Sequence, residues 1–452
     1  MTGNQQRARI NSNRRDKSLE WALSPYGAAA FSSVIFLAAW LLPPSIYSAG
    51  LDEPDYLWLD PLSLLLFASC AVAFILGARL CDRNTSFQSR SPVPAHVLPI
   101  PYIIPPLIIT IAFELIAIFI VIQQQPGILS AVLSGAGGQV KGDLVDVALP
   151  AGISAAGAAT LAVMYWAYHA YQSLANGRGK KMVGRILAFY VGLSFAISLM
   201  TLGRDQIMMI VVGLAVIRTA YRIRSHRDNI GGGQFIAKVA FGLIAIFLIT
   251  ALIRQTTLDE MLGTFYGYTI SGYNRMAAIL HHQLPYLDAG NGDHLFGGIL
   301  QNRTINSLVP FQTMYDLPDQ LDVWLSDFAA VGGAGLIPQY TFASCFGFIF
   351  IDAGWGTIAV MFLCGMFSGY IWLRFKQGKT IGVVVYPVVL FSALMWFGTN
   401  MLINMNTIMF VLTSAALALY ELPFRHLTLA PRGIRVMHPL GIIDQPNPPE
   451  SL

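Results

Sequence analysis

The chain has 452 residues, of which 55% are hydrophobic and only 12% are charged, whereas about a quarter of the residues in an average soluble domain are charged. This composition excludes an ordinary soluble enzyme and predicts an integral membrane protein. The formal net charge of +4 says little about partners, because the distribution of cations matters more than their sum in a membrane protein. Membrane lipids are the expected surroundings, and no nucleic-acid partner is expected.

Apolar runs of about 17 to 25 residues recur from Tyr26 to Tyr420, and a helix of that length crosses a hydrocarbon core of about 30 Å. Lipid offers no hydrogen bonds to bare backbone, so the spans should be α-helices. The predicted fold is therefore all-α and polytopic, with about ten transmembrane helices. We place them near 26–43, 58–78, 101–122, 150–171, 186–203, 206–221, 236–253, 353–373, 381–398 and 406–421.

Lys and Arg residues alternate along the chain with the predicted spans. Most of them fall near 7–17, 79–90, 178–185, 218–238, 374–379 and 425–435. The positive-inside rule assigns these segments to the cytoplasm. Residues 1–25 are then a cytoplasmic tail, 26–421 a single transmembrane domain, and 422–452 a cytoplasmic tail that we expect to be disordered. The stretch 254–352 becomes a large periplasmic loop before span 8, with short interfacial helices.

Four arginines lie on the side that is otherwise poor in cations: Arg204, Arg254, Arg275 and Arg303. A guanidinium is always charged, and its planar fork of donors matches phosphate oxygens two at a time. Arg204 also stands at the N-terminus of a predicted helix, whose dipole favours an anion. These residues indicate an anionic ligand at the level of the lipid headgroups. Anchoring to lipid phosphates, or pairing with nearby acids, is the simpler explanation for any one of them.

His281 and His282 belong to the same outer loop. Imidazole has a suitable intrinsic pKa for a general base near neutrality, although a solvated pair of loop residues is equally compatible with this position. The sequence has no Asp-x-Asp pair, no phosphate-binding Gly-rich loop with Lys, and no Cys/His cluster. Chemistry without a metal or cofactor is therefore expected.

Glu114 lies in the middle of a predicted span. An acidic side chain inside the membrane costs free energy and is usually functional or paired. A transporter would use such a group for proton coupling. His169 in the following span is a candidate structural partner.

Two segments resemble the Wzy-type oligosaccharide repeat-unit polymerases of bacterial O-antigen and exopolysaccharide assembly. One is a Gly-Arg turn that opens an apolar helix, LGRDQIMMIVVGLAVI at 202–217. The other is IPQYTFASCFGFIFIDAGWGTIAVMFLCGMFSGYIW at 337–372, whose DAGWG is similar to the family's Asp-aromatic-Gly-x-x-Gly step. Ala353 departs from that pattern, because an aromatic residue is commoner there.

The resemblance implies an inner-membrane glycosyltransferase with both termini in the cytoplasm. Its substrates would be undecaprenyl-diphosphate-linked glycans at the periplasmic face, joined with inversion at the anomeric carbon, and a chain-length regulator is a candidate partner. The resemblance also implies that Arg204, Arg254, Arg275 and Arg303 hold the carrier diphosphate. His281 or His282, and then Asp352, are the candidate bases; Tyr266, Tyr268, Tyr273 and Tyr340 are candidates for stacking on sugars.

Three other functions remain open at this point. An O-antigen ligase would share the topology and the arginine-diphosphate chemistry, but would transfer the glycan to a lipid A core. A secondary transporter would account for Glu114. A structural scaffold subunit is the third.

Overall fold

The structure is a computed structural model of the whole chain. It describes residues 17–82, 98–127, 130, 151–200, 204–224, 258–286, 292–302, 305–306, 309–318 and 320–425, with isolated positions between 234 and 245. Within these ranges every regular element is a helix and there is no strand. The predicted all-α class is therefore confirmed for the part of the chain that is described.

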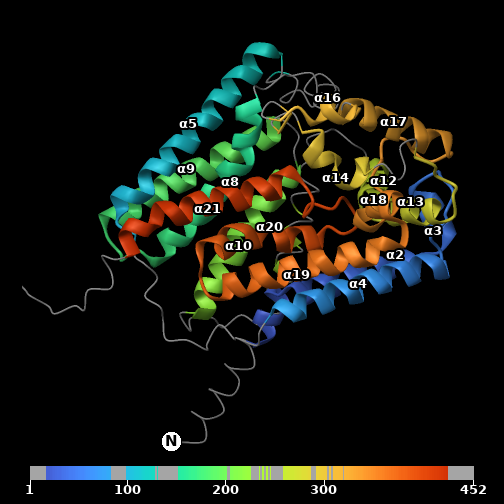
Figure 1. Cartoon of the computed structure of the whole chain (residues 1–452), viewed down its shortest axis with the longest axis horizontal. Coiled ribbons are helices and arrows are strands. Elements are labelled where there is room, and N and C mark those ends of the chain that lie inside the picture. Colours follow the sequence, from blue (N-terminus) through green and yellow to red (C-terminus); the bar gives the residue numbers. More distant parts are fainter. Residues whose placement is uncertain are drawn as a thin grey trace, which may run out of the picture.

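Long helices form the body of the molecule (Figure 1). They are α2 (Pro25–Trp40), α4 (Pro61–Cys81), α5 (Ile100–Gln124), α8 (Ala151–Ser173), α9 (Arg178–Met200), α10 (Arg204–Arg224), α19 (Thr357–Lys376), α20 (Thr380–Leu394) and α21 (Met405–Arg425). Shorter helices cluster at one end: α3 (Pro44–Gly50), α12 (Leu258–Thr269), α13 (Ser271–Leu280), α14 (Asp293–Leu300), α16 (Phe311–Tyr315), α17 (Gln320–Gly333), α18 (Ser344–Ala353) and the 3₁₀ turn Gly354–Gly356.

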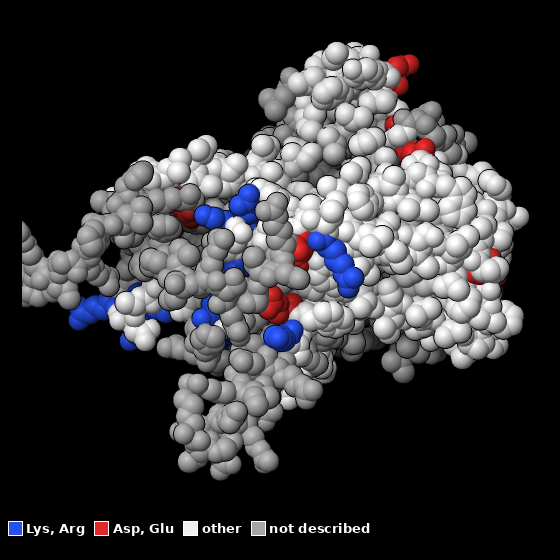
Figure 2. Space-filling model, turned by 60° about the horizontal axis from the view of Figure 1, so that its bottom comes forward, with Lys and Arg blue, Asp and Glu red and all other residues white. Residues whose placement is uncertain are grey.

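Six described helical segments are long and apolar enough to cross a membrane, or seven if Lys17–Leu23 and Pro25–Trp40, bent by 67°, form one span. The chain is thus a multi-pass helical membrane protein. Each expected span overlaps a long helix except 236–253, most of which lies outside the described residues. The total of about ten spans stays a prediction. Figure 2 shows a broad surface without charged side chains, as contact with lipid requires.

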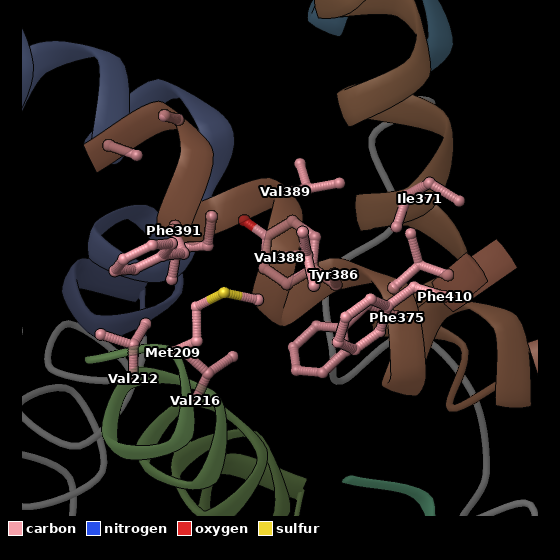
Figure 3. Packing of buried hydrophobic residues seen from close by; sticks show 14 of the residues in the cluster. Met209, Val212, Val216, Ile371, Phe375, Tyr386, Val388, Val389, Phe391 and Phe410 are labelled. Atoms are coloured by element: carbon pink, nitrogen blue, oxygen red, sulfur yellow. The ribbon is translucent and has the colours of Figure 1, made fainter. Parts of the chain in front are cut away.

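The hydrophobic core is centred on α20, which packs against α2, α8, α10, α19 and α21. Its sequence, TIGVVVYPVVLFSAL, is apolar on every face, and nearly all of these residues are buried, as expected of a helix surrounded by other helices. Figure 3 shows Met209 of α10, Phe375 of α19 and Phe410 of α21 around Tyr386 of α20.

Helices α4 and α19 make the most extensive contact between two described helices, although about 290 residues separate them. The two backbones can approach each other because glycines lie at the contact: Gly77 in α4, and Gly365 and Gly369 in α19. A Cβ atom added to Gly365 would lie 2.1 Å from the Phe74 carbonyl oxygen, and one added to Gly369 would lie 2.2 Å from the Ala78 carbonyl oxygen. Small residues at this spacing are a common means of bringing membrane helices together.

The C-terminal ends of α4, α10 and α19 meet at one end of the bundle. Lys376 of α19 pairs with Asp82 after α4 at 2.5 Å, and Arg224 of α10 donates to the Phe375 and Lys376 carbonyls. At the opposite end Asp60 caps α4 through the backbone N–H of Ser63 (2.8 Å), and the short helices pack there. The basic last turns of the three helices therefore lie together.

Candidate functional site

Arg275 and Glu53 form a buried ion pair among the short helices. Arg275 Nη1 lies 3.0 Å from Glu53 Oε1, and Nη2 lies 2.9 Å from Oε2. Both side chains have no exposed surface. The guanidinium also donates to the carbonyls of Ser271 (3.2 Å) and Ile337 (3.0 Å). The carboxylate thus occupies both outer nitrogens of the fork.

Further hydrogen bonds tie this ion pair to its surroundings. The Tyr47 hydroxyl of α3 donates to Glu53, and the Ile337 N–H donates to Glu53 at 2.8 Å. Asn274 donates to Tyr47 (2.9 Å) and accepts from the Tyr56 N–H (2.6 Å). The network joins α3, α13 and the segment before α18. The structure therefore places Arg275 in the interior, where Glu53 occupies the guanidinium that the sequence suggested for an anionic ligand.

The structure does not describe the side chains of the other three arginines that were expected to bind phosphate. Arg204 is the first residue of α10, and its side chain lies outside the described residues. Arg254 and Arg303 also lie outside them. The basic last turn of α10 meets the end of α19, so the backbone places Arg204 at the other end of α10.

His281, just after α13, pairs with Asp60 at the start of α4. His281 Nε2 lies 3.0 Å from Asp60 Oδ1, and the exposed fractions of the two side chains are 42% and 9%. Oδ2 of Asp60 accepts from the Ser63 N–H (2.8 Å) and hydroxyl (2.6 Å). Burial opposes ionisation of this carboxyl, but the bonds from Ser63 and His281 outweigh it and lower the pKa of Asp60.

The pairing with Asp60 suits the His281 imidazole to accept a proton. A ring that donates Nε2–H to Asp60 has a free lone pair on Nδ1, and the carboxylate stabilises the ring when it takes up a second proton. The neighbouring His282 is exposed at a backbone φ of +56°, and no carboxylate is described within ion-pair distance of it. Of the two expected bases, the structure therefore favours His281.

A second histidine, which the sequence did not single out, lies between two carboxylates. His294 Nε2 is 3.2 Å from Asp327 Oδ1 of α17, and His294 Nδ1 is 3.9 Å from Asp352 Oδ1 of α18. Only 4% of the His294 side chain is exposed. Burial opposes protonation, but the hydrogen bond and charge of Asp327, together with the charges of Asp352 and Asp293, raise the pKa of His294 above its ordinary value.

Asp352, the third expected base, is held in a structural position. Its Oδ2 accepts the backbone N–H groups of His294 (2.9 Å) and Leu295 (2.7 Å), which open α14. Its side chain is 3% exposed. Asp352 therefore fixes α14 onto α18 and is a poor choice for a base that must reach a substrate. No sequence signal would have found this cluster, because its members are 33 and 58 positions apart.

The expected sugar-stacking tyrosines fall into two groups. Tyr273 is fully buried, edge-on to Phe36 at 5.2 Å. Tyr340 is 5% exposed and packs edge-on to Tyr268 at 5.4 Å. These two belong to the protein core. Tyr266 and Tyr268 are half-buried in α12, so they alone of the four present ring surface at this end.

Among the described residues, no group of three or more His, Cys, Asp or Glu side chains is arranged to hold a metal ion. Comparison of the chain with protein-family models, with curated proteins and with solved structures finds no match. The functional argument therefore depends on the geometry of the His281–Asp60 pair and on the placement of its neighbours.

Proposed function

We propose that the chain is a bacterial inner-membrane glycosyltransferase that polymerises undecaprenyl-diphosphate-linked oligosaccharide repeat units at the periplasmic face. In this proposal about ten helices span the membrane, both termini are cytoplasmic, and residues 254–352 form the periplasmic loop. The observation that carries the proposal is the His281–Asp60 pair, an exposed imidazole held by a carboxylate that is only 9% exposed. It lies at the end of α4 opposite to Lys376 and Asp82.

The orientation is supported by the basic helix ends. Arg79, Arg222, Arg224, Arg374 and Lys376 lie in the last turns of α4, α10 and α19. The positive-inside rule assigns this end to the cytoplasm. His281, Asp60 and the first residue of α10, Arg204, then belong to the periplasmic end.

The proposed step is a displacement at the anomeric carbon. A hydroxyl of the acceptor glycan attacks C1 of the donor, the bond from C1 to the diphosphate oxygen breaks, and the hydroxyl proton passes to His281 Nδ1. Asp60 stabilises the imidazolium that forms. Cations that hold the departing diphosphate stabilise the developing charge, and we assign that role to Arg204, Arg254 and Arg303. Tyr266 and Tyr268 are the proposed stacking surfaces for sugars.

A gene deletion followed by electrophoresis of the surface glycan tests this function. Loss of a polymerase leaves single repeat units on the surface. Loss of an O-antigen ligase, the alternative of the same class, leaves bare lipid A core and accumulating lipid-linked polymer. An unchanged glycan pattern contradicts both enzymes. Complementation with His281→Gln then asks whether the polymer depends on this imidazole.

A secondary transporter is the second candidate function. The observation that favours it is Glu114, a carboxylate that is buried inside the membrane-spanning bundle and has no cation partner among the described residues. Transport of a labelled solute by reconstituted vesicles, driven by a proton gradient and abolished in Glu114→Gln, would favour this candidate over the glycosyltransferase.

A further inference from the structure

Helix α5 has one face inside the protein and one face toward lipid. Its large exposed side chains include Ile109, Phe113, Ile116 and Phe119. Its buried side chains are Ile103, Leu107, Thr110, Glu114 and Val121, which follow a helical spacing. Glu114 is the acid in this buried stripe, and it faces α8 and α9, the helices that pack against α5. The carboxyl group therefore lies in the apolar interior of the bundle.

The hydrogen bonds that reach Glu114 come from a hydroxyl group. Ser194 Oγ of α9 donates to Oε1 at 2.9 Å and to Oε2 at 3.1 Å. Thr160 of α8 lies beside the carboxyl, but its hydroxyl donates to the Gly157 carbonyl at 2.6 Å. An ionised carboxylate offers about four lone-pair positions and no donor. One donating hydroxyl group does not replace the water that an ionised carboxylate loses in an apolar interior.

Cations on the neighbouring helices are far from Glu114. His169, the candidate partner from the sequence, lies nine residues beyond Thr160 along α8, which corresponds to roughly 13 Å along the helix axis. Arg185, the last basic residue of α9, lies nine residues before Ser194, a similar distance. The side chain at the start of α10, Arg204, lies outside the described residues. No ion pair to Glu114 is present among the described side chains.

Tyr190 is the titratable side chain that faces Glu114 from α9, and the two interact electrostatically. It lies one helical turn before Ser194, on the same face. Its hydroxyl is buried beside the Thr110 and Thr160 hydroxyl groups and makes no hydrogen bond of standard geometry to a described residue. On α21, the Tyr420 hydroxyl bonds to the Tyr102 carbonyl, near the start of α5 and far from Glu114. The polar cluster thus holds a carboxylate that has hydroxyl groups around it and no cation partner among the described residues.

We propose that Glu114 is a reversible proton-binding site inside the membrane-spanning bundle. In the loading step a hydronium ion transfers its proton to one Oε atom, an O–H bond forms, and a water molecule is released. The neutral acid then has a donor as well as acceptors, and the lone pairs of the Tyr190 hydroxyl provide an acceptor for it. Release of the proton to water reverses the step. The proposal goes beyond glycosyl transfer and does not depend on it.

Labelling with dicyclohexylcarbodiimide tests the protonated state directly. This reagent adds to a protonated carboxyl group in an apolar environment and leaves a stable N-acylurea, which mass spectrometry locates on a peptide. At about pH 7 an ordinary Glu is more than about 99% ionised. The full-length protein in detergent should nevertheless be labelled at Glu114, with a rate that falls by roughly tenfold for each pH unit above the transition.

Two residues provide matched controls. Glu53 is also buried, but it is paired with Arg275, so it should stay unlabelled under the same conditions. Ser194→Ala removes a hydroxyl that stabilises the ionised form, so labelling of Glu114 should persist to higher pH in that variant. Infrared spectra provide a second measurement, which does not require dicyclohexylcarbodiimide to reach the buried carboxyl group. The carbonyl band of carboxylic acids at neutral pH should be weaker in Glu114→Gln than in the wild type.

One result would overturn the proposal: a Glu114 that reacts as slowly as Glu53, together with the same carboxylic acid band in the wild type and in Glu114→Gln.

Discussion

Arg275 and Glu53 meet in a two-point ion pair, with N–O distances of 3.0 and 2.9 Å, although 222 positions separate them in the chain. Both side chains are sealed from solvent. The pair joins α13 to the segment after α3, and through the Ile337 N–H it also holds the segment before α18. The end of the bundle that carries His281 is built around this contact.

Removing one member of this pair should be costly. Glu53→Gln or Arg275→Met leaves an uncompensated buried charge, and each should destabilise the fold by about 3–5 kcal/mol. The double variant removes both charges and should recover much of that loss. Thermal unfolding in detergent of the wild type, both single variants and the double variant measures the coupling. Additive losses would contradict a direct energetic link between the two residues.

The contact between α4 and α19 should not tolerate a side chain at Gly365. In Gly365→Ala the new Cβ would lie 2.1 Å from the Phe74 carbonyl oxygen, so the helices must separate, at a cost of about 1–3 kcal/mol. Gly192→Ala is the matched control, because a Cβ on this exposed residue of α9 would meet no atom within 4 Å. That variant should be neutral or more stable by about 0.5–1 kcal/mol. Equal melting temperatures for the two variants would contradict the packing argument.

The stability contribution of His294 should depend on pH. Its pKa is raised in the folded state, mainly by Asp327 acting against burial. The contribution should be complete below the ordinary value of 6.5 and should be lost as the pH rises through the higher folded-state pKa. Thermal unfolding of the wild type and His294→Gln between about pH 5 and pH 9 checks this. The difference between them should shrink toward high pH; a difference that grows would show that His294 is folded in its neutral form.

The pair of His281 and Asp60 should determine polymerisation under the proposed function. Loss of a general base costs about 10²–10⁴-fold in rate, so His281→Gln should lower the turnover of a lipid-linked repeat unit in vesicles with little change in KM. Asp60→Asn keeps a side-chain oxygen to cap α4 but removes the charge behind the imidazole, and should give a smaller loss in turnover. His282→Asn is the comparison variant for the neighbouring histidine, because Asn tolerates the left-handed backbone conformation at this position. A greater loss in His282→Asn than in His281→Gln would assign the base to His282.

The helices of the bundle were largely predictable, because a long apolar run in lipid has few alternatives to a helix. The span expected at 101–122 became α5, Ile100–Gln124, and the one at 406–421 became α21, Met405–Arg425. The short apolar piece expected before span 8 is α18, Ser344–Ala353, which ends where Gly354 takes a φ of +54°. Hydropathy does not tell which faces of these helices meet.

The site was less predictable, because its partners come from distant parts of the chain. All four outer arginines were candidates for the diphosphate, but Arg275 is paired with a carboxylate 222 positions away. His169 was a candidate partner of Glu114, which bonds to Ser194, 80 positions away. His294 carried no local signal at all, since its carboxylate partners come from α17 and α18. Such pairings are decided by tertiary packing.

The tight contact between α4 and α19 also sets an order of events during synthesis. Asp82 and Lys376 are 294 positions apart, so a ribosome that adds about 5–20 residues per second needs roughly 15–60 s to deliver the partner of α4. During this interval the Gly77 face of α4 lies in the bilayer without α19. The yield of folded protein would then depend on what covers the Gly77 face of α4 in this interval, whether an insertase, a chaperone or another copy of the nascent chain.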